Sequence, residues 1–221
     1  MKKINFNLGE NITAFTTLKD NTVDKNSIAA DLGIEPSALF VPEQTHSSHV
    51  EIIDSLSQSE GDDMQGLDAL VTQEPGKALA ARTADCLPVF FFDPKVRVIA
   101  VAHGGWRGLV AGILENTVAN MINLGAKPPR IKVQFGPHIA VESYEVGDDI
   151  LSNFCPDEVT ERDGRRFVDL SKVALNRLAQ VGVLPENISL CDIDTFTNPD
   201  CFSARKEGID TGRMYSVIML D

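Results

Sequence analysis

The chain has 221 residues, of which 43% are hydrophobic, and its 32 acidic and 20 basic side chains give a formal net charge of -12. This length and apolar content suit one domain with a full core, because no linker, repeat or low-complexity segment divides the chain. The net charge argues against non-specific nucleic-acid binding through a basic surface.

Cysteine usage and hydropathy predict the compartment. The four cysteines form no CxxC pair and no regular framework, which favours a reducing environment. The basic N-terminal residues are not followed by the apolar segment of a signal peptide, and the longest apolar runs are too short to span a bilayer. We therefore expect a cytoplasmic protein without membrane partners.

The first part of the chain alternates short strand-like segments with polar loops. Residues 27–32 are predicted as a short helix that Ser27 caps and Gly33 ends. Residues 57–66 are polar and acidic and are predicted as an exposed loop. Short strands are predicted at residues 4–8, 12–16, 38–41, 50–53, 69–72 and 77–81.

Two apolar runs, residues 87–92 and 96–102, are rich in Val, Ile and Phe and are separated by an Asp-Pro-Lys turn, so they predict a β-hairpin. The clearest helix covers residues 109–124, whose apolar positions repeat with a period of 3.6. A further helix is predicted after Ser171 as its N-cap. The remaining strands are predicted at residues 131–135, 188–193 and 214–220. The pattern indicates an α/β (α+β) fold: a single domain over residues 1–221, with a mixed β-sheet flanked by helices.

Candidate metal or catalytic side chains lie at the ends of the two hairpin strands. Cys86 borders the first strand, and His103 directly follows the second. Cysteine and histidine bind soft divalent metals or form nucleophile–base pairs. His46 is a third candidate, although His49 shares its loop and spacing alone does not choose between them. Two histidines and one cysteine leave one tetrahedral position open, as a catalytic zinc site requires.

Cys86 also has a purely structural interpretation. A cysteine beside a run of phenylalanines is usually a buried packing residue, but Asp85 directly before Cys86 is poorly explained by packing. No local zinc motif such as HExxH or CxxC is present. The residues alone therefore predict a site and give only weak support for a metal.

The segment after His103 favours a functional interpretation. Gly104 and Gly105 allow close backbone approach before a helix, where free N–H groups favour an anion, and Arg107 offers a planar fork for an oxyanion. Trp106 between them is interpreted as a packing residue.

Two further residues carry weaker signals. His138 follows a Gly-Pro pair at a strand end, where a surface turn residue is the alternative. Arg213 belongs to a basic cluster near the C-terminus, which is usually a solvated face.

Taken together and in order, these motifs resemble a known family. The chain is similar to the YfiH/laccase-domain family of purine nucleoside phosphorylases, formerly called polyphenol oxidases, some of which carry the name peptidoglycan editing factor. The resemblance runs from about residue 15 to the C-terminus. The matching segments are residues 44–46, 68–72, 83–89, 103–108, 136–139, 144–147 and 211–213.

The resemblance implies a zinc site formed by His46, Cys86 and His103, and it thereby selects His46 over His49. Zinc is the expected cofactor. Copper is less favoured, although a single Cu(II) could bind adventitiously because copper outcompetes zinc at most N/S sites. The implied activities are phosphorolysis of adenosine, inosine and methylthioadenosine, together with adenosine deamination. The expected partners are a purine nucleoside and phosphate, in a monomer or homodimer.

The expected roles of the other residues extend this interpretation. Cys86, His103, Asp85 and Arg107 are the expected catalytic residues, with Asp85 orienting a metal ligand. Phosphate and substrate are expected to bind at five residues: Gly104, Gly105, Arg107, His138 and Arg213.

Other classes of function stay open. One is a metal-free cysteine hydrolase, with Cys86 as nucleophile and His103 as base, acting on an amide or a peptidoglycan precursor. Another is a non-catalytic partner-binding or metal-storage domain. Copper-dependent phenol oxidation is a further alternative, although the sequence lacks the multiple His pairs of a multicopper cluster.

Overall fold

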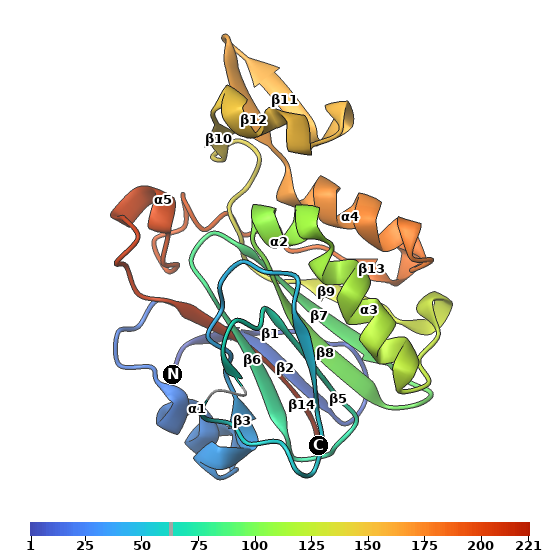
Figure 1. Cartoon of the computed structure of the whole chain (residues 1–221). Helices are drawn as coiled ribbons and strands as arrows, with labels where there is room; N and C mark the ends of the chain where they lie inside the picture. The colour runs from blue at the N-terminus through green and yellow to red at the C-terminus, as the bar shows by residue number, and fades with distance from the viewer. Residues whose placement is uncertain (62–63) are drawn as a thin grey trace.

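The computed structural model of the protein describes residues 1–61 and 64–221 (Figure 1). The predicted α/β class with mixed β-sheet is confirmed, and the described strands form three sheets. The largest has six strands in the order β13-β9-β7-β8-β5-β4. These are β4 (Val50–Ile53), β5 (Ala69–Thr72), β7 (Leu87–Asp93), β8 (Val98–Gly104), β9 (Lys132–Phe135) and β13 (Ile188–Ser189).

A five-stranded sheet packs against one face of the large sheet, in the order β1-β2-β14-β6-β3. Its strands are β1 (Lys3–Asn5), β2 (Ile12–Thr17), β3 (Leu39–Phe40), β6 (Ala78–Thr83) and β14 (Met214–Leu220). A small antiparallel sheet stands at one end of the molecule (Figure 1). It contains β10 (Glu145–Val146), β11 (Val159–Arg162) and β12 (Arg165–Val168).

Helices cover the other face of the large sheet. They are α2 (Trp106–Ala111), α3 (Ile113–Asn123) and α4 (Leu170–Gln180), whereas α1 (Lys25–Leu32) and α5 (Ala204–Glu207) lie beside the five-stranded sheet and the C-terminal segment (Figure 1). Among the described residues, every helix falls short of the length and apolar character needed to cross a lipid bilayer.

The predicted hairpin forms the centre of this layered arrangement. Alternate residues of β7 face opposite cores: Phe91 packs with the helices, while Phe90 and Phe92 pack with the five-stranded sheet. A strand buried on both faces needs apolar residues at every position, which explains the uninterrupted run in the sequence. The antiparallel register pairs Pro88 with His103 and so brings the two predicted site segments to the same end of the sheet.

The long helix predicted at residues 109–124 is wrong in its bounds and continuity. The helical segment begins at Trp106 and divides into α2 and α3 at Gly112, whose φ of 93° is incompatible with a continuous α-helix. Apolar periodicity continued across the break and concealed it.

The predicted helix caps also need correction. Asp24, not Ser27, caps α1, and Ser27 completes the capping box from the third helical position. Asp169, not Ser171, caps α4 by accepting a hydrogen bond from the amide of Lys172. In both helices an aspartate two or three residues before the predicted cap takes that role, as aspartate and serine are comparably good caps.

Other segments depart from the sequence prediction. Within the predicted exposed loop at residues 57–66, Ser59 and Met64 are buried, and residues 62–63 lie outside the described part. Of the strand predicted at residues 188–193, only β13 forms. The small sheet was not predicted, because its short polar strands lack a clear apolar alternation.

The effect of substituting Gly112 distinguishes a continuous helix from two helices that are divided at this residue. In a continuous exposed helix, Gly112→Ala would stabilise the protein by up to about 1 kcal/mol through helix propensity. Because Gly112 adopts a left-handed conformation, we expect the substitution to lower the free energy of unfolding by about 1–2 kcal/mol. Urea denaturation measures the change, and a gain in stability would contradict the described break.

Candidate metal centre

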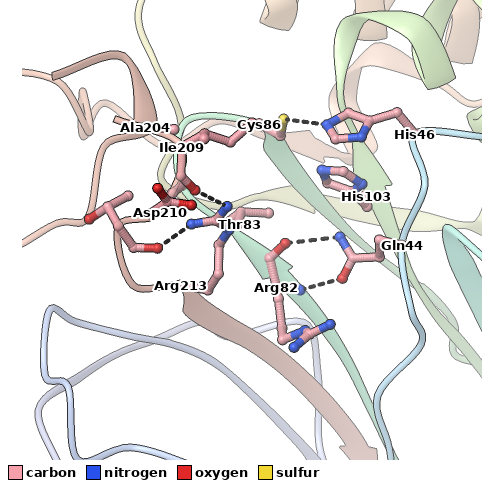
Figure 2. Close-up of a pocket in the computed structure, with 12 residues that line it drawn as sticks. Gln44, His46, Arg82, Thr83, Cys86, His103, Ala204, Ile209, Asp210 and Arg213 are labelled. Atoms are coloured by element: carbon pink, nitrogen blue, oxygen red, sulfur yellow. Dashed lines mark hydrogen bonds between the residues drawn. The ribbon is translucent and has the colours of Figure 1, made fainter. Parts of the chain in front are cut away.

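His46, Cys86 and His103 come together at one end of the central hairpin. One nitrogen or sulfur atom of each lies within 4.8 Å of the others, and Cys86 Sγ is 3.7 Å from His46 Nε2. Cys86 directly precedes β7, His103 lies in β8, and His46 lies in the loop between β3 and β4. The three residues line a cavity of about 530 Å³ (Figure 2).

The buried carboxylate of Asp68 holds two of these residues in place. Its oxygens accept hydrogen bonds from the backbone amides of Thr45, His46 and Ser47, and from His103 Nδ1 at 2.7 Å. The hydrogen bonds from the backbone amides fasten the loop in which His46 adopts a left-handed φ of 61°. Because Nδ1 of His103 donates to Asp68, Nε2 of the same ring is left for a metal or for Cys86.

Sequence reasoning gave Asp68 no role, although it begins one of the segments on which the family resemblance rests. Nothing in its spacing separates it from an ordinary acid before a strand. Only the fold shows that it lies beneath the 45–47 loop and beside His103.

Charges within the cluster favour the forms that bind metal. Burial raises the pKa of the Cys86 thiol, but the imidazoles of His103 and His46 outweigh this effect and lower it to about 6. Burial lowers the pKa of His103, yet Cys86 and Asp68 together raise it to about 9. Burial also raises the pKa of Asp68, while hydrogen bonds from His103 and Ser47 bring it down to about 2. A thiolate at neutral pH is the form of cysteine that coordinates a metal.

The donor set fits a tetrahedral zinc ion. Zinc bonds of about 2.1 Å to nitrogen and about 2.3 Å to sulfur place neighbouring ligand atoms about 3.5 Å apart. The 3.7 Å between Cys86 Sγ and His46 Nε2 agrees with that spacing. Two imidazoles and a thiolate also suit copper, so the donor atoms alone do not select the metal.

Gly105 leaves the space that the cluster occupies. A Cβ atom at this position would lie 2.5 Å from His46 Cδ2 and 3.3 Å from Cys86 Sγ. Any other residue at position 105 would therefore displace His46. Gly105, which the sequence indicated as a site residue, contributes by leaving this space free. The neighbouring Gly104 is equally restricted, since its Cβ would lie 2.7 Å from the carbonyl oxygen of Leu87.

Asp85 does not contact the metal ligands in the way expected from the sequence. Its Oδ1 accepts a hydrogen bond from the Thr195 hydroxyl and its Oδ2 accepts one from the Arg205 amide. The Asp85 carboxylate therefore fastens the C-terminal segment beside Cys86, and Asp68 is the acid that orients His103. The left-handed φ of 93° at Asp85 shows how sharply the chain turns before Cys86.

The two predicted phosphate-binding arginines are placed differently. Arg213 lines the cavity, but its guanidinium donates to the backbone carbonyls of Ile209 and Thr211 (Figure 2) and to that of Gly212. It thus shapes a wall of the cavity. Arg107 is exposed and stacks on the Trp106 ring, 4.5 Å from its centroid, and it is not among the residues that line the cavity.

His138 is not brought to the cluster. It is buried and lines a separate cavity of about 270 Å³. Its expected contribution to the same substrate site therefore has no support in the geometry.

Several residues around the cluster have roles that the sequence did not predict. Gln44 bonds through its side chain to both backbone groups of Arg82 and fastens the loop to β6 (Figure 2). Thr83 is buried, lines the cavity, and its hydroxyl has no hydrogen-bond partner among the described residues. Arg205 lies over the Tyr144 ring, 5.1 Å from its centroid. None of these roles leaves a local pattern in the sequence.

The cluster predicts the metal-binding behaviour of single variants. We expect about one zinc ion per chain in the intact protein. His46→Ala, Cys86→Ala and His103→Ala each remove a ligand atom, so each should weaken zinc binding by more than the roughly 10–100-fold cost of losing a supporting residue. Competition with a chromogenic chelator measures the affinity.

His49→Ala is the matched control, because His49 shares the loop of His46 but is not part of the cluster. It should retain the affinity of the intact protein. A loss of affinity in His49→Ala with retention in His46→Ala would contradict the described site.

Comparison with known proteins gives several similar prokaryotic proteins. The chain is 43% identical over 158 residues to "Purine nucleoside phosphorylase" of Deinococcus radiodurans, a match that covers 69% of this chain and 61% of that relative, less than two thirds of its length. It is 33% identical over 211 residues to "Adenosine deaminase RL5" from an unknown prokaryotic organism, covering 87% of this chain and 79% of the relative.

Solved structures share the fold over nearly the whole chain. Protein NMB0706 of Neisseria meningitidis superposes with a TM-score of 0.87 at 27% identity, with both chains fully covered. YlmD from Geobacillus stearothermophilus also reaches 0.87, at 23% identity, covering 97% of this chain and 94% of that one. The family model described as "Multi-copper polyphenol oxidoreductase laccase" matches residues 6–221. The chain therefore belongs to this laccase-like family.

Proposed function

We propose that the protein is a zinc-dependent purine nucleoside phosphorylase of the cytoplasm, which acts on adenosine, inosine and methylthioadenosine and also deaminates adenosine. The observation that carries the proposal is the convergence of His46, Cys86 and His103 at a cavity of about 530 Å³. Relatives named for purine nucleoside phosphorolysis and adenosine deamination support the substrate class.

Zinc held by these three residues would supply a Lewis acid and lower the pKa of a water molecule bound to it. The protein's own residues prepare the site for this chemistry. Asp68 keeps the proton of His103 on Nδ1, and Gly105 leaves room for the His46 ring. Rigid ligands of this kind need no rearrangement as charge develops in the reaction.

The cavity wall offers hydrogen-bonding groups for a nucleoside. The buried hydroxyl of Thr83 has no partner among the described residues, so it gains a hydrogen bond when a substrate hydroxyl or ring nitrogen reaches it. Asp210 and Thr211 line the same cavity from the C-terminal segment. Arg213 holds that segment in place through three backbone carbonyls.

Phosphate is proposed to bind on the side of Cys86 where Arg107 and Arg205 flank Tyr144. Both arginines lie close enough to Tyr144 to lower its pKa, although burial and the neighbouring Cys86 dominate and raise that pKa to about 12. Asp85 keeps Arg205 near the cluster by accepting its amide hydrogen bond. Gly104 and Gly105 contribute the close backbone approach at the start of α2, where amide groups favour an anion.

One observation favours a second candidate function, a metal-free hydrolase with Cys86 as nucleophile and His103 as base. The lowered pKa of Cys86 beside an imidazole is the arrangement that activates a cysteine nucleophile. Loss of activity on chelation and recovery with zinc would exclude this alternative.

A product assay with and without phosphate tests the proposed function. Zinc-loaded protein incubated with adenosine should release adenine and ribose 1-phosphate only when phosphate is present, and inosine by deamination. Cys86→Ala should abolish both reactions, whereas His49→Ala should preserve them. Absence of all three products from zinc-loaded protein would overturn the proposal.

The phosphate arm of the same assay tests Arg107. Arg107→Ala removes a positive charge next to the proposed phosphate position, so KM for phosphate should rise about 10-fold or more, in line with the loss of one charged hydrogen bond. Arg162→Ala, an exposed arginine on the small sheet, is the matched control and should leave KM unchanged. An unchanged phosphate KM in Arg107→Ala would rule out this assignment.

A further inference from the structure

We propose that Ser171 and His138 form a second nucleophilic centre, separate from the metal cluster, which accepts an acyl group from small uncharged or cationic esters. The two side chains lie in hydrogen-bond contact, with Ser171 Oγ 2.7 Å from His138 Nε2. Both line the cavity of about 270 Å³ that contains none of the three metal-cluster residues. A hydroxyl bonded to an imidazole that a third group orients is the arrangement of an activated serine.

The hydrogen bonds of His138 fix the direction of proton transfer. Its Nδ1 is 2.9 Å from the carbonyl oxygen of Gly136, which only accepts, so Nδ1 carries the ring proton. Nε2 is then the acceptor for the Ser171 hydroxyl. Burial lowers the pKa of His138, against smaller opposing effects from Gly136, Asp169 and Asp194, which keeps the ring in its neutral, basic form.

Backbone contacts hold the base rigidly beside the nucleophile. The amide of His138 donates to the carbonyl of Ile193, and the His138 carbonyl accepts from the amide of Thr195. Ser171 lies in the first turn of the 11-residue helix α4, half-buried and facing the cavity. Neither side chain requires rearrangement to react.

The start of α4 also provides groups that stabilise an oxyanion. The cap Asp169 accepts the amide of Lys172, but the amides of Leu170 and Ser171 have no acceptor among the described residues. Free amides at the positive end of a helix stabilise the negative oxygen of a tetrahedral intermediate. We place the oxygen of a carbonyl attacked by Ser171 near these donors, because Ser171 lies on the same helical turn.

The charges around the cavity indicate the class of ester. Carboxylates line it and none of its lining residues in the described chain is a lysine or arginine; the acids are Glu142, Asp169, Asp192 and Asp194. Both oxygens of Asp194 already accept hydrogen bonds from neighbouring groups, so this acid contributes charge and does not orient His138. An anionic ester would be repelled, while a neutral or cationic one would be accepted.

The reaction balances without any added cofactor. Ser171 Oγ bonds to the ester carbonyl carbon, its proton passes to His138 Nε2, and the bond to the alcohol oxygen breaks. His138 returns the proton to the leaving alcohol. Water then hydrolyses the acyl-serine by the reverse proton path, releasing the acid and restoring Ser171.

Covalent labelling of the intact chain with a neutral alkyl fluorophosphonate tests the proposal. Serine displaces fluoride from phosphorus, and peptide mass spectrometry locates the modified residue. We expect phosphonylation of Ser171, its absence in Ser171→Ala, and a rate about 10²–10⁴-fold lower in His138→Gln, the usual range for loss of a general base. Ser143→Ala is the matched control, because the Ser143 hydroxyl donates to Asp194 beside the same cavity and makes no hydrogen bond to a histidine among the described residues.

Absence of phosphonate on Ser171 of the unaltered protein would overturn the proposal, whatever the stability of the variants. Labelling of Ser171 at the same rate in folded His138→Gln would overturn it as well, because the pair would then be only a structural brace. A choline ester should slow labelling and a succinate hemiester should not. Equal effects of the two esters would overturn the assigned substrate class.

Discussion

The buried carboxylate of Asp68 is the interaction on which the candidate site depends. It joins the loop of His46 to the strand of His103 by accepting hydrogen bonds from three backbone amides and from one imidazole. The same carboxylate that fastens the loop also orients His103, a candidate metal ligand. Removing the carboxylate would leave the buried Nδ1 of His103 and three loop amides without this acceptor, and an unpaired buried donor costs more than its hydrogen bond contributes when formed.

The layered core provides the rigid frame around Asp68. Because β7 and β8 are buried between helices and a second sheet, the end of this hairpin has little freedom, and Cys86 and His103 share that end. The C-terminal segment closes the cavity from the side opposite His46 (Figure 2), and hydrogen bonds to Arg213 and Asp85 hold this segment in place. Segments far apart in the chain thus form one site because strand ends meet there.

The sequence predicted those features that depend on a local pattern of residues. The hairpin, its Asp-Pro-Lys turn and the placement of Cys86 and His103 at strand ends follow from apolar runs and turn residues. The choice of His46 over His49 came only from the family resemblance. The role of Asp68 depends on tertiary contacts, and the break at Gly112 depends on one backbone angle. Apolar periodicity indicates neither of them. The sequence also indicated His138 as a site residue, but in the fold its side chain bonds to Ser171 and lies apart from the cluster.

Zinc affinity of Asp68→Asn is the most direct measurement of the central claim. An amide keeps the size of the side chain but cannot accept from all four donors, so the affinity should fall about 10–100-fold. Asp194→Asn, which alters an acid that fastens a loop away from the cluster, should bind zinc as the intact protein does. Undiminished affinity in folded Asp68→Asn would contradict the account, because the ligands would then be held without this carboxylate.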